Sequence, residues 1–388
     1  MNILFQYLKG DKIIWLIIFM ISMISVLAVY SSTGALAFKY QGGNTEYFLF
    51  KHLILMGVGI LVMYFTHLLD YRLFAKYSNI LLYVSVPLLA YTIFQSPAAE
   101  VNSAARWIAL PFGLSFQPSD LGKLSIMIYL ARVLTEKQEV VKDFRQGFVP
   151  VISVVLLVCG FIAPANLSTA LLVFVCCIIM MFVAGISLQH IGGFMLIGLL
   201  GLTLLMFTAK RATTWRHRIA DYTERWTDPE YRANYQTEQA NIAIATGNLI
   251  GKGPGKSTQR NVLPHPYSDF VYAIIIEEYG LIGGIIVLGL YLILLFRVAV
   301  IVTVSKTFGA LLAAGLASML VVQALVNMGV TVGILPVTGL PLPMLSMGGT
   351  SMLFTGVMLG IILSVSRNAY ENLRETNLNS TPEAVLVS

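Results

Sequence analysis

One acidic residue stands where a membrane helix is expected to begin. Asp269 closes the segment Leu263-Pro-His-Pro-Tyr-Ser-Asp269, and a long apolar run follows it. This position is at or beside a helix N-terminus, where free amide groups and the helix dipole favour a carboxylate. Two interpretations follow. The carboxylate only caps the helix, or it is an ionised acid at the mouth of a membrane cavity, available as a general base.

Two further acids lie in the same apolar run. Glu277 and Glu278 follow Asp269 by eight and nine residues, which is roughly 12–14 Å along a helix axis. A carboxylate at that depth is costly in lipid, so we expect at least one of them to face the bundle interior and bind a partner. A structural hydrogen-bonding role is at least as well supported as a catalytic one.

Polar residues also interrupt the apolar runs upstream. The segment 117–123 (QPSDLGK) opens a helix, and its Asp120 and Lys123 can pair on one face because they are three residues apart. Arg106 precedes a tryptophan, and Asn166 lies at a polar junction between two apolar runs. Each is a candidate for the same polar site as Asp269.

The segment 336–350 (PVTGLPLPMLSMGGT) is rich in proline and glycine and stands before the last apolar run. It contains Ser346, Gly348 and Gly349. Irregular backbone at membrane depth is tolerated only where protein buries it or where it lines a polar cavity. The segment therefore predicts such a cavity.

The elements that must position these residues are membrane helices. Of the 388 residues, 57% are hydrophobic and 11% are charged, whereas about a quarter of a soluble domain is charged. We expect an all-α polytopic membrane protein that forms a single domain over 1–388. About ten transmembrane helices are predicted, at 13–35, 52–69, 77–94, 119–134, 148–163, 168–183, 191–208, 269–296, 308–333 and 346–365.

The orientation follows from Lys and Arg, which concentrate in one set of short loops. These loops are expected on the cytoplasmic side, so both termini and a tail of about 368–388 lie in the cytoplasm. A large loop, about 210–268, then lies on the opposite side and includes an amphipathic helix near 237–249.

That loop carries nine Lys or Arg and five Asp or Glu residues. Loops of this length escape the rule that places positive charge inside. The excess is either tolerated surface charge or a site for an anionic ligand at the membrane surface. No run of five or six like charges exists, so no nucleic-acid-binding arm is expected.

Taken together, these segments resemble the SEDS family (shape, elongation, division and sporulation) of membrane glycosyltransferases of the bacterial cell wall. The resemblance covers nearly the whole chain. Within the family, the segments Gly10–Trp15 and Tyr30–Ser32 resemble the division-type members. The motifs that carry the family resemblance are 106–108 (RWI), 117–123, Tyr235-Gln236, 263–273 (LPHPYSDFVYA), 277–280 (EEYG), 327–329 (NMG), 335–343 (LPVTGLPLP) and 346–349 (SMGG).

The resemblance implies an inner-membrane enzyme that polymerises lipid II, the undecaprenyl-diphosphate-linked disaccharide-pentapeptide, by inverting glycosyl transfer. It implies that Asp269 is the essential acid. The substrate-binding candidates are Arg106, Lys123, Arg218, Arg260 and His265. The structural candidates are Asp120, Asn166, Glu277, Glu278, Ser346, Gly348 and Gly349.

Two positions depart from the family pattern. Asp120 stands where glutamate is usual, and Ala165-Asn166 stand in a region that usually reads Gln-Pro-Asp. Because an amide is neither a base nor an anion, a catalytic or metal-binding role for Asn166 is doubtful.

The implied partners are lipid II, a cognate class B penicillin-binding transpeptidase and other division proteins, with no nucleic acid. A divalent cation, Mg²⁺ or Mn²⁺, could stabilise the diphosphate, and no organic cofactor is expected. Two alternatives remain: a flippase that moves lipid II outward, and a division scaffold without chemistry. A flippase would not need a carboxylate placed to take a proton from a sugar hydroxyl group.

Overall fold

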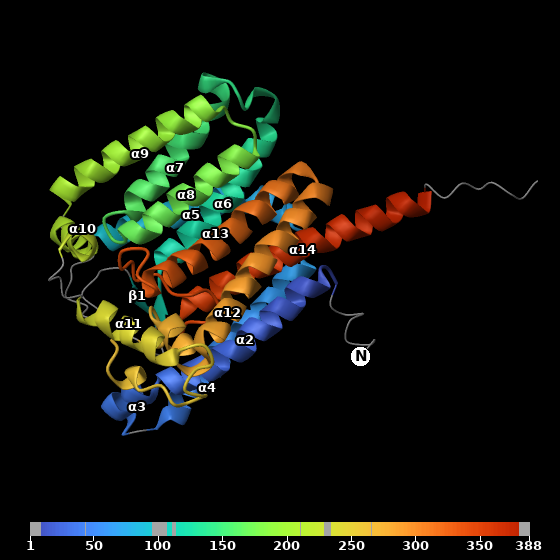
Figure 1. Cartoon of the computed structure of the whole chain (residues 1–388). Coiled ribbons are helices and arrows are strands. Elements are labelled where there is room, and N and C mark those ends of the chain that lie inside the picture. The colour runs from blue at the N-terminus through green and yellow to red at the C-terminus, as the bar shows by residue number, and fades with distance from the viewer. Residues whose placement is uncertain are drawn as a thin grey trace, which may run out of the picture.

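The computed structural model is a bundle of membrane helices with a small two-stranded hairpin (Figure 1). It describes residues 9–42, 44–94, 107–110, 114–209, 211–228, 234–264 and 266–379. The helices are α2 (Lys12–Ser32), α3 (Gly34–Gln41), α4 (Thr45–Leu68), α5 (Arg72–Phe94), α6 (Pro118–Glu136), α7 (Val149–Ile162), α8 (Leu167–Val183), α9 (Leu188–Thr208), α10 (Ala212–Thr227), α11 (Tyr235–Gly247), α12 (Val271–Val304), α13 (Thr307–Thr331) and α14 (Thr350–Asn379). Strands β1 (Ile108–Leu110) and β2 (Leu114–Phe116) pair antiparallel.

Eight helices of the described chain are long and apolar enough to cross a membrane. Two more helices complete the predicted set of ten. They are α8, which is apolar but has only 17 residues, and α6, which carries Asp120, Lys123 and Arg132 among its 19. The polytopic all-α fold expected from the sequence is therefore confirmed.

The bundle has a buried centre and a lipid-facing rim. In α13 and α14, 72% of the most apolar window is buried inside the protein, against 22% in α5 and 11% in α9. Small residues and alanines line α13, so that neighbouring helices approach it closely. The exposed side chains of α9 are almost all aliphatic or aromatic, as a lipid environment requires.

Three helices have a boundary that lies more than five residues from the one expected from the sequence. The final helix begins at Thr350 and continues to Asn379, so most of the expected polar tail is helical. Its polar extension is held by contacts such as the hydrogen bond from the Tyr370 hydroxyl to Asp11. The second span begins at Thr45, because Asn44 caps it through the Tyr47 amide.

The third difference concerns α12, which was expected as one helix over 269–296. It begins at Val271, ends at Val304, and is broken at Gly280, whose φ of 71° and ψ of −174° are not helical. Main-chain amides beyond the break bond to the turn after α11, from Leu281 to Asn248 O and from Ile282 to Leu249 O. Glycine is required at this break because a side chain there would collide with the Leu249 carbonyl.

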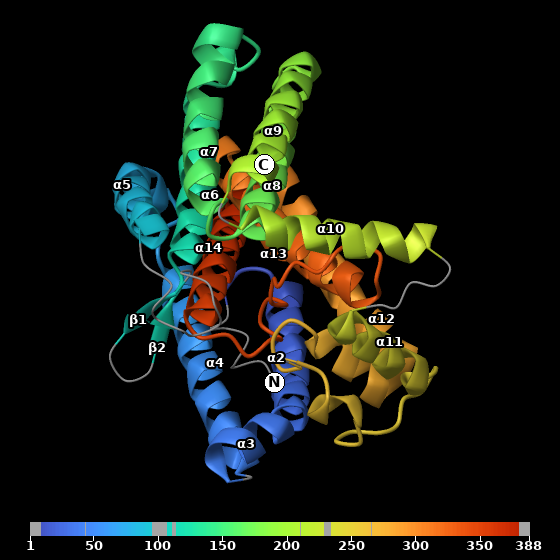
Figure 2. The same cartoon turned by 90° about the vertical axis from the view of Figure 1, so that its left-hand side faces the viewer.

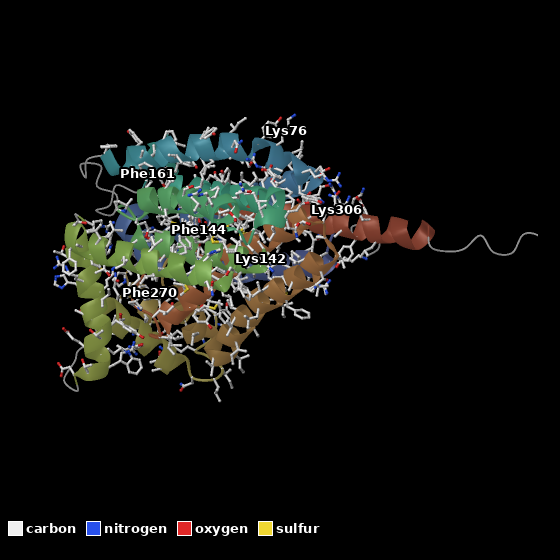
Figure 3. The ribbon with its side chains drawn as sticks, turned by 90° about the horizontal axis from the view of Figure 1, so that it is seen from above. Lys76, Lys142, Phe144, Phe161, Phe270 and Lys306 are labelled. Atoms are coloured by element: carbon white, nitrogen blue, oxygen red, sulfur yellow. The ribbon has the colours of Figure 1, made fainter. Side chains whose placement is uncertain are left out.

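The connections separate into two ends of the bundle. The N-terminus of α2 and the last part of α14 lie together at one end, which we call the Asp11 end (Figure 1). Figure 3 shows Lys76, Lys142 and Lys306 toward this end and Phe270 toward the opposite one. The opposite end, called the Asp269 end, carries α3, the hairpin, α10 and α11. There α10 runs across the bundle rather than along it (Figure 2).

At the Asp11 end, one carboxylate joins three helices. The Asp11 carboxylate caps α2 through the amides of Ile13 and Ile14. It also forms an ion pair with Arg297 of α12 and accepts a hydrogen bond from Tyr370 of α14 at 2.9 Å. This cluster fixes the ends of α2, α12 and α14 relative to one another.

Candidate active site

Asp269 lies two residues before α12, in a turn at the Asp269 end of the bundle. Its carboxylate is partly exposed and accepts a hydrogen bond from the Ser268 hydroxyl at 2.9 Å. The N-cap residue of α12 is Phe270, and no side chain of the described chain caps this helix end. The carboxylate is therefore not a helix cap, and it remains available for other chemistry.

The backbone around Asp269 is held from two other segments. The Ser346 hydroxyl donates to Ser268 O at 2.6 Å, and the Met347 amide donates to Tyr267 O at 2.8 Å. The side-chain amide of Asn327, on α13, donates to Asp269 O at 2.8 Å. Three consecutive carbonyl groups are thus bonded, so the position of the carboxylate is fixed by its main chain.

The irregular segment between α13 and α14 lies beside this turn and is buried or half-buried from Pro336 to Gly349. Its carbonyl groups would be costly to bury without partners. Side chains from other helices supply those partners: Asn327 for Leu340 O, Gln323 for Pro341 O, Tyr291 for Pro343 O and Ser25 for Leu345 O. This is the buried irregular backbone that the Pro- and Gly-rich sequence predicts.

Gly339 brings this irregular segment next to the carboxylate. It adopts a positive φ of 70°, a conformation that favours glycine. A Cβ atom at this position would lie 3.6 Å from Asp269 Oδ2. The segment thus forms one wall of the space in front of the carboxylate.

Helix α10 is fastened across the same segment by three side chains on one face. Arg218 donates to Val337 O at 3.0 Å, Tyr222 to Ile334 O at 2.8 Å and Arg225 to Gly333 O at 3.1 Å. The spacing of four and three residues places them on one stripe of the helix. Between α10, the start of α11 and this segment lies a small pocket that Arg218 and Val337 help to line.

The Arg218 guanidinium lies within electrostatic reach of the Asp269 carboxylate, and the Arg211 guanidinium lies near that of Arg218. Burial lowers the pKa of Arg218, and the positive charge of Arg211 lowers it further, while the negative charge of Asp269 opposes both effects. Burial also lowers the pKa of Arg211. Both groups donate to main-chain carbonyls, Arg211 to Ala165 O at 3.0 Å. Positive charge is therefore held at this site at an electrostatic cost, as expected where an anion is to bind.

Sequence reasoning included Arg218 but missed Arg211. Its adjacency to Lys210 and its place at the start of the large loop were visible in the sequence. Its contact with the α7–α8 junction joins residues 46 positions apart, and no local pattern indicates that contact.

Asp120 and Lys123 form a buried ion pair, with Lys123 Nζ 2.8 Å from Asp120 Oδ1. Lys123 also donates to Gln323 Oε1 at 3.3 Å, and Gln323 in turn donates to Pro341 O. This chain of contacts connects α6 through α13 to the irregular segment. Asp120 Oδ2 is buried and has no hydrogen-bond partner among the described residues.

Asn166 is the N-cap residue of α8, where its side chain accepts a hydrogen bond from the Thr169 amide at 3.3 Å. It lines a small pocket with Ser119 and Ala165. Gly349 and Thr350 pack on β2, with the Thr350 hydroxyl 3.1 Å from Ser115 O. These residues support the walls of the site.

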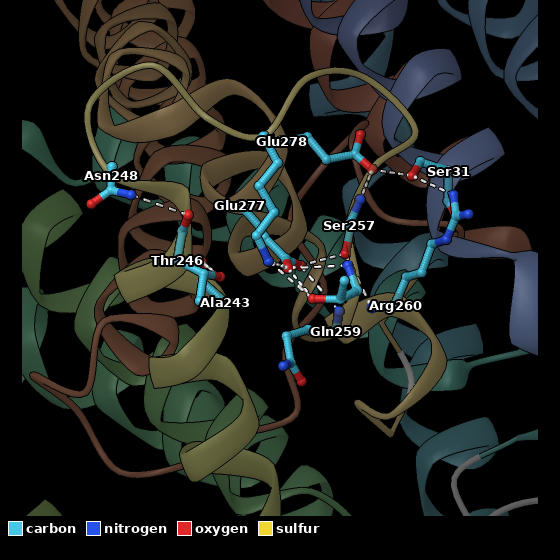
Figure 4. Close-up of polar contacts among 11 residues, drawn as sticks. Ser31, Ala243, Thr246, Asn248, Ser257, Gln259, Arg260, Glu277 and Glu278 are labelled. Carbon is cyan, nitrogen blue, oxygen red and sulfur yellow. Dashed lines mark hydrogen bonds and ion pairs between the residues drawn. The ribbon is translucent and has the colours of Figure 1, made fainter.

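Glu277 and Glu278 belong to a separate cluster, shown in Figure 4. Glu277 forms an ion pair with Lys252 at 2.6 Å and accepts from the hydroxyl groups of Ser257 and Thr258. Glu278 accepts from the Ser31 hydroxyl at the end of α2 and from the Ser257 amide.

Both acids thus have partners inside the protein, in the loop and, for Glu278, also at the end of α2. The main chain before the break at Gly280 is bonded to the same loop, because the amides of Lys252 and Gly253 donate to Glu277 O and Glu278 O. Arg260 donates to Ser31 at 3.3 Å in the same cluster, and among the described residues its hydrogen bonds do not reach the Asp269 segment. Arg106 and His265 lie outside the described residues.

The carboxylates near this site are few for a divalent cation. No group of three or more His, Cys, Asp or Glu side chains gathers anywhere in the described ranges. Mg²⁺ is usually held by one or two carboxylates together with substrate phosphates. Asp269 supplies a single carboxylate, so these residues do not form a dedicated cation site.

The chain matches a protein family over most of its length. The family model described as "Cell cycle protein" (FTSW_RODA_SPOVE) matches residues 11–371. Stage V sporulation protein E of Bacillus subtilis is 33% identical over 92% of this chain and 97% of its own length. A probable peptidoglycan glycosyltransferase FtsW of Geobacter sulfurreducens is 34% identical over 92% of this chain and 95% of its own.

Solved structures with the same fold include the Thermus thermophilus rod shape determining protein RodA. It aligns with a TM-score of 0.67 at 25% identity, over 94% of this chain and 99% of that one. A chain from a peptidoglycan synthase complex, described as coordinating polymerization and crosslinking, aligns with a TM-score of 0.68 at 27% identity. That alignment covers 93% of this chain and 99% of the other.

Proposed function

This chain belongs to the SEDS family of cell cycle proteins, the family of FtsW, RodA and SpoVE, and we propose that Asp269 is the general base of its reaction. The chain is an integral inner-membrane protein and a peptidoglycan glycosyltransferase. The observation that carries the proposal is the placement of the Asp269 carboxylate. Hydrogen bonds to the main chain fix its position, it does not cap α12, and it lies within electrostatic reach of Arg218.

The substrate that we propose is lipid II. Polymerisation requires that an acceptor sugar hydroxyl lose its proton and attack the anomeric carbon of the lipid-linked chain. Asp269 would take that proton as the new glycosidic bond forms with inversion. A positioned base of this kind typically contributes about 10²–10⁴-fold in rate.

The leaving group is the lipid diphosphate, which gains negative charge as the bond between the anomeric carbon and the diphosphate oxygen breaks. We propose that Arg218 and Arg211 stabilise this charge, because both are partly buried cations whose hydrogen bonds within the described ranges go to main-chain carbonyl groups. Fixed cations in a site with little water stabilise developing charge strongly.

Lys123 is proposed as a further contact of the diphosphate. Its ammonium group is buried and its ion pair with Asp120 leaves one carboxylate oxygen unsatisfied. Gln323 links this pair to the irregular segment. A diphosphate bound at Lys123 would therefore be coupled by hydrogen bonds to both α6 and α13.

The orientation proposed from the sequence places the Asp269 end outside the cytoplasm and both termini inside. The clustering of Lys76, Lys142 and Lys306 toward the Asp11 end supports it (Figure 3). Septal wall synthesis with a class B penicillin-binding transpeptidase is the proposed setting. It is supported by the FtsW relatives and by the likeness to a chain of a synthase complex.

The direct test is incubation of the purified chain in detergent with purified lipid II, alone and with the transpeptidase. Glycan strands longer than the disaccharide, separated by gel electrophoresis, are the expected product. A chain that moves lipid II across vesicle membranes but forms no strands under either condition would be a flippase instead.

A further inference from the structure

The turn between α11 and the Lys252 loop exposes two large aliphatic side chains. Leu249 is 64% exposed and Ile250 is 80% exposed, at the tip of an otherwise polar loop. Main-chain hydrogen bonds hold the turn against α12, and a side chain at Gly251 would collide with the Glu278 carbonyl. Adjacent exposed aliphatic side chains that continue onto other exposed apolar surface mark a contact with an apolar environment.

The length of α2 shows how far this turn lies from the Asp11 end of the bundle, and hence its depth in the membrane. Asp11 lies at one end of α2 and Ser31 at the other, and Ser31 donates to Glu278. Twenty residues of helix span about 30 Å, which is the thickness of the hydrocarbon core of a bilayer. Because Asp11 marks one boundary, Glu278 and the adjoining turn lie at the other.

The turn is also continuous with a lipid-facing surface. Its carbonyl groups accept hydrogen bonds from Leu281 and Ile282, which begin the membrane-crossing part of α12. Both side chains are about half exposed, as are Ile285 and Ile286 one turn further along. The exposed aliphatic surface therefore runs from the turn directly onto a helix face that lipid must cover. Lys256, in the same loop, is exposed and polar.

We propose that Leu249 and Ile250 insert into the outer leaflet and anchor the α11–α12 platform to the membrane. The platform consists of α11, the loop 248–264 and the first part of α12, and it has its own small core built from Ala240, Ala243, Leu263, Phe270, Ala273 and Ile274. Asp269 immediately precedes Phe270 in this unit. The anchor would hold the carboxylate at a constant depth relative to a lipid-linked diphosphate. This last consequence rests on the proposed function, whereas the insertion does not.

The experiment places a nitroxide spin label at Ile250→Cys, with Lys256→Cys as the matched control in the same loop. The chain is reconstituted into vesicles of phosphatidylethanolamine and phosphatidylglycerol, and wild type treated in parallel gives the background from its native cysteines. Collision rates are then measured with oxygen, which concentrates in lipid, and with a water-soluble nickel chelate. The label at Ile250→Cys should collide several-fold more with oxygen relative to nickel than the label at Lys256→Cys.

Equal nickel accessibility at the two positions would overturn the insertion. Protection of Ile250→Cys that arises only when the transpeptidase is added would overturn it too, and would identify the turn as a protein interface. A second arm measures polymerisation in the same vesicles. Leu249→Ser/Ile250→Ser should slow it several-fold while Lys256→Ser does not, and equal rates would overturn the role of the anchor in placing Asp269. The spin label reports membrane depth and does not depend on catalysis. A failure of the proposed anchor can therefore be distinguished from a failure of the proposed base.

Discussion

The side-chain amide of Asn327 bridges two main-chain carbonyls, Asp269 O at 2.8 Å and Leu340 O at 2.7 Å. It thereby joins the turn that carries the proposed base to the irregular segment that faces it. Asn327 is 2% exposed, so water cannot readily replace either bond. The two walls of the site are held together by one amide group.

Asn327→Ala should reduce the rate of polymerisation more than it reduces stability. Loss of the amide leaves two carbonyls without this donor, at about 1–3 kcal/mol for a buried group. The turn is then free to shift, and small displacements of a base are costly in rate. We expect kcat to fall at least tenfold with little change in KM, measured by single-time-point strand synthesis over a series of lipid II concentrations.

Gln323→Ala is the matched control, because it removes a buried amide from the same helix that bonds to Pro341 rather than Asp269. It should lower the melting temperature about as much as Asn327→Ala but lower kcat less. Equal losses of kcat in the two variants would show that Asn327 only stabilises the fold.

The buried Asp120–Lys123 pair allows structure and substrate binding to be separated. Lys123→Met alone should destabilise the protein by roughly 3–5 kcal/mol, because the carboxylate is left buried and unpaired. The double variant Asp120→Leu/Lys123→Met should recover much of that stability, measured as the melting temperature in detergent. If Lys123 contacts the diphosphate, the double variant remains inactive although it is folded. Recovery of activity together with stability would reduce the pair to a structural element.

Arg211 and Arg218 are expected to act on the leaving group. Arg218→Met and Arg211→Met should each lower kcat by about ten- to a hundredfold, as the loss of one preorganised charge donor commonly does. Arg216→Met, on the exposed face of α10, is the control and should retain its rate. If all three variants polymerise lipid II equally well, the basic residues of α10 have no role in the chemistry.

The Asp11 cluster predicts a pH dependence of stability. Burial alone would raise the pKa of Asp11, but hydrogen bonds from Arg297, the Ile14 amide and Tyr370 lower it below the usual value. A carboxyl with a lowered pKa stabilises the folded state above its unfolded pKa, near 4, and this contribution is lost as the pH falls through the folded pKa. The melting temperature of wild type should thus decline between about pH 5 and pH 2 more than that of Asp11→Asn. Parallel declines would mean that the ion pair with Arg297 contributes nothing measurable.

Much of this arrangement follows from sequence. Apolar runs and their lengths predict ten helices, and the Pro- and Gly-rich segment 336–350 predicts irregular backbone beside a polar site. The position of Asp269 beside a helix start is likewise visible. These features are local, because each depends on residues close together in the chain.

The partners of these residues are not local and could not be predicted. Ser31 and Glu278 are 247 positions apart, and Asn327 and Asp269 are 58 apart. The break in α12 is another example. Gly280 within an apolar run reads as a tolerated helix residue, and only the approach of the turn after α11 requires its positive φ. The partners of Glu277 and Glu278, in the loop and on α2, are likewise distant in sequence and were beyond sequence reasoning.

The central claim is that the Asp269 carboxylate removes a proton, and substitution by its amide tests it most directly. Asp269→Asn keeps the size of the side chain and its hydrogen bond to Ser268, so folding and membrane content should be unchanged. The measurement is the initial rate of lipid II polymerisation by equal amounts of purified wild type, Asp269→Asn and Asp269→Glu. The Asn variant should be slower by about 10²-fold or more, and the Glu variant, whose carboxylate is displaced by one methylene, should also be poorly active. An Asn variant that polymerises lipid II at close to the wild-type rate would contradict the account, and the base would have to be sought elsewhere, beginning with Glu278.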